Sequence, residues 1–169
     1  MNLSKNHKIK EKKVPKNCIF CKPQMLDIVH QTKHSLVVIN LFPALAETNL
    51  KDPLPIKISS IQRGIQIPTF LIIPREHYDK QGEFPKDEWN DLSTLTADVV
   101  AFLSKNGYTD AYNFSFPPGH SMRHVPHYHD HIPALKPSQR LLKRIEKRPK
   151  IKDELCEEIY ELFKNFYLK

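Results

Sequence analysis

The stretch from Asp87 to Lys105 has the most regular pattern in the chain and constrains the fold most. Its large apolar side chains recur at spacings of three and four, which places them along one face of an α-helix. They are Trp89, Leu92, Leu95, Val99, Phe102 and Leu103. The pair Asn106-Gly107 follows directly and is a typical helix stop. We therefore expect one long amphipathic helix whose apolar face is turned to a core.

Segments that resemble strands stand on both sides of this helix. Residues 35–40 and 70–73 are short, apolar and rich in β-branched side chains, and we interpret 108–116 and 125–132 as two further strands. The stretch 42–64 contains several prolines and is expected to be a long irregular loop. Strands, then a helix, then more strands predict an α+β fold rather than a doubly wound sheet.

The two ends of the chain differ from its middle. Residues 1–16 are polar and rich in lysine, so we expect a disordered basic tail before a folded domain at 17–135. Residues 136–169 are expected to form a helical extension. Within it, 136–152 is basic and loosely helical, whereas 153–168 has the pattern of an amphipathic helix. The apolar face of that last helix is expected to pack on the chain's own core, with a partner subunit as the alternative.

The apolar segments of the chain bear on its compartment, and its cysteines bear on metal binding. The 169 residues contain no apolar run long enough to span a bilayer, and no apolar segment follows the basic N-terminus, so we expect neither a signal peptide nor a membrane partner. We expect one domain, in the cytoplasm or another internal compartment. Cys18 and Cys21 form a C-x-x-C pair, which in an intracellular chain is typical of metal ligands or a redox pair. A reduced pair without a ligand remains the alternative.

Five of the nine histidines lie between positions 120 and 131. Side chains alternate along a strand, so His127, His129 and His131 would point the same way. Such a row can bind a metal, or one imidazole can attack phosphorus while its neighbours hold oxygens or protonate the leaving group. An imidazole suits this attack because its pKa is close to neutral. The alternative is a histidine-rich surface strand with incidental metal affinity.

Four stretches, in order along the chain, resemble the histidine-triad (HIT) proteins. Residues 127–133 read His-Tyr-His-Asp-His-Ile-Pro and resemble the signature His-φ-His-φ-His-φ-φ, in which φ is hydrophobic. Residues 17–22 resemble the opening of zinc-bearing bacterial members, and 71–77 resemble their strand ending in Pro-x-x-His. Asn113 and the Gly-His-Ser at 119–121 resemble the Asn and Gly-Gln-Ser that precede the triad. The resemblance spans residues 17 to 135.

The resemblance implies an antiparallel sheet with one long helix, usually paired as a homodimer. It also implies that His129 attacks the α-phosphate of a nucleotide and forms a covalent nucleotidyl-histidine, which water or another acceptor then resolves. By the same resemblance His131 contacts the phosphate, and Asn113 and Ser121 hold phosphate oxygens or orient the leaving group. His127 supports the triad or belongs to a zinc site.

In the zinc-bearing members, the matching residues bind one metal ion. In this chain they are Cys18, Cys21, His77 and His127. Two thiolates and two imidazoles make a closed tetrahedral site, which is structural rather than catalytic. The spacing from Ser121 leaves His124 as an alternative fourth ligand.

The chain departs from the family pattern at several positions. Family members usually place the first triad histidine three residues after the serine, where this chain has His124, so a triad that begins at His127 is shifted by three residues. Asp130 occupies a φ position, so on a strand it would point away from the histidines and toward the core. Either that face is open in this chain, or the buried carboxylate pairs with a partner such as Arg123 or a lysine. His120 replaces the usual glutamine, and it is either a phosphate contact or a surface histidine in a turn.

The leading functional prediction is a nucleotide hydrolase or nucleotidyl transferase. One alternative is a nucleotide-binding protein without turnover, suggested by Asp130 and the shifted triad. Another is a nucleic-acid-associated protein, suggested by the net charge of +7 and the basic segment 136–152. No basic stripe interleaved with aromatic residues supports this last reading.

Overall fold

The computed structural model describes residues 17–40, 69–108 and 124–135 as continuous stretches. It also describes the backbone of 45–47, 65–66 and 140–141, together with the single residues Pro15, Asn113, Ser115, Glu161, Phe163 and Asn165.

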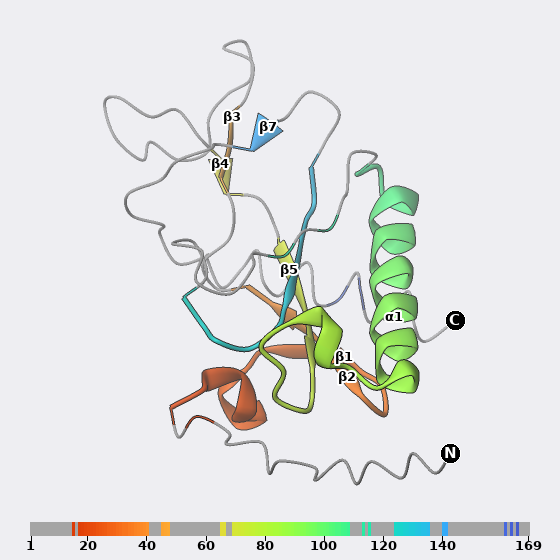
Figure 1. Ribbon diagram of the computed structural model, residues 1–169. Coiled ribbons are helices and arrows are strands. Elements are labelled where there is room, and N and C mark those ends of the chain that lie inside the picture. The colour runs from red at the N-terminus through yellow and green to blue at the C-terminus, as the bar shows by residue number, and fades with distance from the viewer. Residues whose placement is uncertain are drawn as a thin grey trace, which may run out of the picture.

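A four-stranded antiparallel sheet forms the centre of the fold (Figure 1). Its strands, in the order β1-β2-β5-β6, are β1 (Ile28–Gln31), β2 (Ser35–Ile39), β5 (Thr69–Pro74) and β6 (Asp130–Pro133). The strands predicted at 35–40 and 70–73 are thus confirmed as β2 and β5. Because β5 and β6 are antiparallel neighbours, the C-terminal end of β5 and the N-terminal end of β6 lie at the same end of the sheet.

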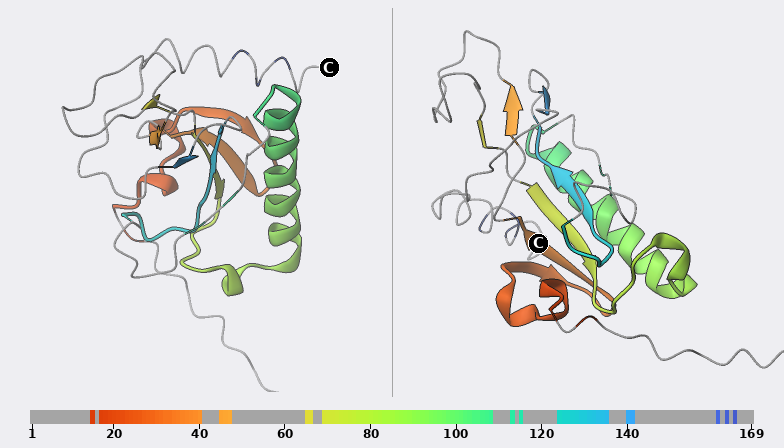
Figure 2. Two further views of the ribbon diagram at one scale, coloured as in Figure 1. Left: turned by 90° about the horizontal axis from the view of Figure 1, so that it is seen from above. Right: turned by 60° about the vertical axis from the view of Figure 1, so that its left-hand side comes forward.

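One long helix, α1 (Lys86–Lys105), covers one face of this sheet (Figures 1 and 2). The predicted helix and its stop are confirmed: Gly107 has a φ of +85°, and the Tyr108 N–H donates to the Leu103 carbonyl at 2.9 Å. No other helix in the described stretches approaches its length, and none of those described could cross a membrane. One main helix on an antiparallel sheet confirms the α+β prediction.

Every residue of the two central strands, β2 and β5, is buried. Because side chains alternate along a strand, both faces of these strands are therefore covered. Toward α1 they contribute Val37, Ile39, Phe70 and Ile72. Toward the other face they contribute Leu36, Val38, Leu71 and Ile73, which pack with Cys18 and Phe20. The 3-10 turn η1 (Ile19–Cys21) packs on this second face through Phe20. A second turn, η2 (Pro23–Met25), follows it with all three residues exposed, and a third, η3 (Gln81–Glu83), precedes α1.

A small second sheet corrects two expectations from the sequence. It consists of β4 (Ile65–Gln66), β3 (Leu45–Glu47) and β7 (Arg140–Leu141), in that order (Figure 1). The stretch 42–64 is therefore not irregular at 45–47, and 136–152 is extended rather than helical at 140–141. Local sequence could not reveal this, because each of these short strands is paired only with a segment distant in the chain.

The strand predicted at 108–116 is not found at the positions that can be described. Tyr108, Asn113 and Ser115 lie outside any strand, and the other residues of that stretch fall outside the described residues.

The C-terminal segment contributes to the main core. Glu161, Phe163 and Asn165 are helical; the outer two are exposed and Phe163 is fully buried. The Phe163 ring packs against Phe70 at 5.2 Å and Phe102 at 4.9 Å between centroids. At Phe163 the chain therefore covers its own core, as the sequence favoured. The other residues of the predicted helix lie outside the described part, and the domain boundaries remain predictions.

Candidate metal centre and histidine cluster

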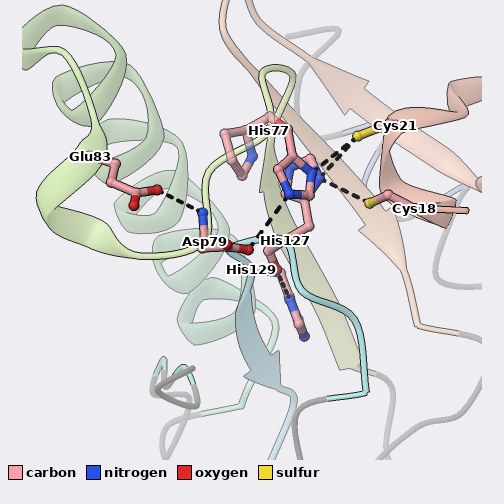
Figure 3. A network of polar contacts seen from close by, with 8 residues as sticks. Cys18, Cys21, His77, Asp79, Glu83, His127 and His129 are labelled. Carbon is pink, nitrogen blue, oxygen red and sulfur yellow. Dashed lines mark hydrogen bonds and ion pairs between the residues drawn. The ribbon is translucent and has the colours of Figure 1, made fainter. Parts of the chain in front are cut away.

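Four predicted metal ligands come together at the end of the sheet where β5 ends and β6 begins (Figure 3). Cys18 and Cys21 lie at η1, His77 follows β5, and His127 precedes β6. One ligand atom from each residue lies within 4.8 Å of all the others. His124 is exposed and does not belong to this group, so the structure selects His127 of the two alternatives.

The distances between these ligand atoms suit a tetrahedral metal ion. Sγ of Cys21 lies 3.4 Å from Nδ1 of His77 and 3.5 Å from Nδ1 of His127, and Sγ of Cys18 lies 3.4 Å from the latter atom. A tetrahedral zinc ion with ordinary bond lengths separates a sulfur and a nitrogen ligand by about 3.6 Å. The four residues therefore fit a zinc-sized ion.

Both imidazoles have a partner on the nitrogen that faces away from the thiols. Nε2 of His127 lies 3.0 Å from the Pro74 carbonyl, which can only accept, so Nε2 carries the proton and Nδ1 keeps its lone pair. Nε2 of His77 faces a carboxylate oxygen of Asp79 at 3.6 Å, which favours the same tautomer. Partners of this kind orient histidine ligands in metal sites. The two lone pairs thus point at the thiols.

The thiols are the part of this centre that most needs a cation. Cys18 is buried and Cys21 is half-buried. Burial and the neighbouring Cys18 thiol raise the pKa of Cys21 to about 12. A bound divalent cation reverses this effect, because thiolates are the form that binds metal. Two thiolates and two neutral imidazoles would leave no open position, so the arrangement fits a structural ion.

The side chain of His129 is oriented by the backbone of His127. Nδ1 of His129 lies 2.7 Å from the carbonyl oxygen of His127, so it is Nδ1 that donates (Figure 3). Nε2 of His129 therefore carries a lone pair, as a nucleophile requires. The His131 ring lies 4.9 Å from that of His129, and the Phe20 ring packs against His129 from η1, also at 4.9 Å.

The strand predicted at 125–132 is wrong over its first half, because β6 begins only at Asp130. The ladder with β5 ends at the pair Ile72 and Asp130, short of Pro74, which has no N–H to donate. Instead, the Tyr128 N–H donates to the Tyr78 carbonyl. His127 and His129 both precede the strand. The His127 ring contacts the thiols, and the His129 ring lies beside that of His131.

Asp130 lies on the face opposite the histidines, as predicted, and is only 4% exposed. Its carboxylate accepts a hydrogen bond from the Tyr128 hydroxyl at 2.9 Å and another from the Asn113 side chain. The partner is thus a tyrosine and an amide; Arg123 lies outside the described residues. Burial raises the pKa of Asp130, and the two hydrogen bonds oppose that rise.

The predicted phosphate contacts are described only in part. Asn113 is exposed and reaches Asp130, whereas His120 and Ser121 lie outside the described residues. The structure brings the four predicted metal ligands together and sets His129 beside His131, and the phosphate contacts remain predictions.

Sequence reasoning missed several supporting groups. Asp79 could have been found, since a carboxylate two residues after a ligand histidine is well placed to reach its ring. Phe20 stands inside the C-x-x-C pair but carries no sign that its ring faces the histidines. The Pro74 carbonyl has no sequence signal, because any residue supplies one.

Comparisons with known proteins bear on the fold. No sequence-family model and no curated protein matches the chain. Solved structures do. A Hit-like protein involved in cell-cycle regulation from Bartonella henselae has a TM-score of 0.65 at 14% identity, covering 92% of this chain and 99% of that one. A Zn-bound histidine triad family protein from Mycobacterium smegmatis has a TM-score of 0.61 at 13% identity, covering 90% and 94%.

A third similar structure is that of an enzyme. Plasmodium falciparum diadenosine triphosphate hydrolase, in complex with Cyclomarin A, has a TM-score of 0.55 at 17% identity, covering 84% of this chain and 76% of that one. Together with the sheet, the helix and the position of the histidines, these likenesses establish that the chain has the histidine-triad fold. The fold implied by the sequence resemblance is thereby confirmed.

Proposed function

We propose that this chain is a nucleotide hydrolase or nucleotidyl transferase whose nucleophile is His129. The observation that carries this proposal is the hydrogen bond from Nδ1 of His129 to the His127 carbonyl, which leaves Nε2 as a lone-pair donor. The same fold occurs in a diadenosine triphosphate hydrolase. Phosphate esters and phosphoramidates of nucleosides are the substrates that suit such a nucleophile.

In the proposed reaction, Nε2 of His129 attacks the α-phosphorus of a nucleotide. A P–N bond forms while the bond from phosphorus to the leaving group breaks, and the leaving group departs with its electron pair and takes up a proton. Water or another acceptor then attacks the nucleotidyl-histidine, restoring the free imidazole. His131, whose ring lies beside that of His129, is proposed to contact phosphate oxygens, with Asn113, His120 and Ser121 as further contacts.

We further propose that Cys18, Cys21, His77 and His127 hold a structural zinc ion. When bound, the ion would supply a fixed positive centre that keeps the thiolates charged and ties η1 to the segment before β6. The ligand distances and the orientation of both imidazoles support this assignment. The chain's own backbone, through the His127 carbonyl, then orients the nucleophile.

The test is turnover combined with capture of the covalent adduct. Wild-type protein is incubated with adenosine phosphoramidate or diadenosine triphosphate, and product is measured together with the intact protein mass after a rapid acid-free quench. We expect turnover and a mass increase of one adenylyl group, both lost in His129→Ala. His34→Ala is the matched control, because His34 lies in the β1–β2 turn and faces Asp87 rather than the cluster. Full activity in His129→Ala would overturn the proposal.

A second candidate, a nucleotide-binding protein without turnover, is favoured by one observation. Asn113, which the resemblance assigns to the phosphate, donates instead to the buried Asp130. This candidate predicts binding of a nucleoside monophosphate by calorimetry, no product, and no covalent adduct. The adduct experiment therefore separates it from the enzyme.

The association state and location of the chain also remain proposals. The resemblance implies a homodimer, which light scattering of the purified chain would test. Binding of nucleic acid through the basic segment 136–152 would appear as an affinity that falls steeply with salt concentration. A cytoplasmic location follows from the sequence expectation alone.

A further inference from the structure

We infer that Phe20 is a positioning residue for His129, and that a metal ion bound by Cys18 and Cys21 holds Phe20 in that position. The inference rests on the proposed function, in which His129 is the nucleophile. It extends that function because the metal centre would then determine how the reacting imidazole is held, beyond stabilising the fold.

The geometry around Phe20 is the first step. Phe20 stands between the two cysteines in η1 and is 8% exposed. Its ring meets the His129 ring edge-on, at 4.9 Å and 67°, and meets the His127 ring at 5.8 Å and 81°. Edge-to-face contacts of this kind have a preferred geometry. One side chain of the metal-binding turn thus contacts both a metal ligand and the nucleophile.

The position of Phe20 depends on how its turn is held. η1 has three residues, and its closing hydrogen bonds run from the N–H of Cys21 to the Cys18 carbonyl at 3.3 Å and from that of Lys22 to the Ile19 carbonyl at 3.0 Å. A 3-10 turn this short has poor hydrogen-bond geometry and little stability of its own. Cross-linking both cysteines through one ion to His77 and His127 would fix the turn, and Phe20 with it.

His129 lies just before β6, and Nδ1 of its ring donates a hydrogen bond to the His127 carbonyl. The ring can still rock about that bond unless neighbours pack against it. Phe20 and His131 do so. The His127 carbonyl and Phe20 both belong to the segments that hold the proposed metal.

The consequence is a specific kinetic effect. A protein whose His129 imidazole is displaced should still bind substrate, but the imidazole reaches the in-line attack geometry less often. A misplacement of about 1 Å can cost on the order of a hundredfold in rate. Loss of the Phe20 ring should therefore lower kcat and leave KM nearly unchanged.

The test compares Phe20→Leu with Ile19→Ala. Ile19 is the other residue between the cysteines and is 39% exposed, so its truncation alters the same turn while removing far less buried side chain than a change at Phe20. Zinc content is measured by mass spectrometry, and the ring nitrogens of 15N-labelled histidines are followed by NMR, with assignment from His129→Gln. For Phe20→Leu we expect full zinc content, a His129 signal moved toward a mixture of tautomers, and a kcat about tenfold to a hundredfold lower. Ile19→Ala should match the wild type in all three measurements.

Further variants keep the test decisive. Phe20→Tyr retains the ring and should restore the wild-type His129 signal. Phe20→Met retains most of the buried volume and replaces Phe20→Leu if that protein does not fold. Stripping zinc with a chelator should move the His129 signal, and adding zinc back should return it. An unchanged His129 signal and an unchanged kcat in a folded, zinc-loaded Phe20→Leu or Phe20→Met would overturn the inference. The ring signals report on the contact even if His129 proves not to be a nucleophile, so the two proposals fail separately.

Discussion

The hydroxyl of Tyr128 donates a hydrogen bond to the carboxylate of Asp130 at 2.9 Å, on the face of the chain opposite the histidines. The Tyr128 ring is itself held by Phe84, at 5.1 Å and nearly perpendicular. The resemblance to the HIT signature would place hydrophobic side chains at both positions. A buried polar pair therefore lies directly behind the proposed nucleophile, and it can be tested through pH.

The first prediction concerns the pH dependence of stability. Because burial raises the folded-state pKa of Asp130 above its ordinary value of 3.8, the folded protein binds this proton more tightly than the unfolded chain. The free energy of unfolding should therefore fall as pH rises from 3.8 through the folded-state pKa. Asp130→Asn removes this dependence, so the wild type should lose stability relative to that variant over this range in urea unfolding. The exposed Asp27→Asn serves as control; a constant difference between wild type and Asp130→Asn would contradict the prediction.

The second prediction concerns the metal ligands. Cys21→Ser removes one thiolate, so the purified protein should lose its zinc. A ligand that binds only the folded state, at a free concentration of about a hundred times its Kd, stabilises that state by about 3 kcal/mol. For a chain of this size that corresponds to a Tm lower by roughly 6–12 °C, measured by calorimetry. Cys156→Ser makes the same chemical change outside the C-x-x-C pair and should retain its zinc. Retention of zinc by Cys21→Ser would argue against the assigned site.

The third prediction concerns Asp79, the exposed carboxylate behind His77. Asp79→Ala removes the group that favours the metal-binding tautomer of His77. Substitutions of such outer partners typically weaken metal binding by about ten- to a hundredfold. We expect that loss in competition titrations against a chelator, with the site still able to fill at high zinc concentration. Lys80→Ala, on the neighbouring exposed residue, should leave the affinity unchanged, and equal affinities for both variants would show that Asp79 has no such role.

The fourth prediction concerns the C-terminal segment. Phe163 is fully buried against Phe70 and Phe102, so Phe163→Ala would leave a cavity in the core. Truncation of a buried phenylalanine costs about 3–5 kcal/mol in the free energy of unfolding. Asn165→Ala, at an exposed helical position, should change it by less than about 0.5 kcal/mol. If urea unfolding gave the two variants the same stability, Phe163 would not belong to the core.

Much of the fold could be predicted because its signals are local. The spacing of apolar residues from Trp89 to Leu103 and the following Asn106-Gly107 determine α1 and its end, since periodicity and turn chemistry act within a few residues. The same holds for β2 and β5, whose short β-branched runs suit a strand buried on both faces. The short strands β3 and β7 escaped prediction, because their partners lie elsewhere in the chain.

The candidate site divides in the same way. The sequence by itself determined which residue types could bind metal and which histidines could act, because C-x-x-C and His-x-His-x-His are chemical patterns as well as structural ones. Only the tertiary structure decided between His124 and His127, started β6 at Asp130, and brought Phe20 against His129. These outcomes depend on the Pro74 carbonyl and on the antiparallel pairing of β5 with β6. Backbone groups and contacts between distant segments have no signature in the order of residues, so only the folded chain reveals them.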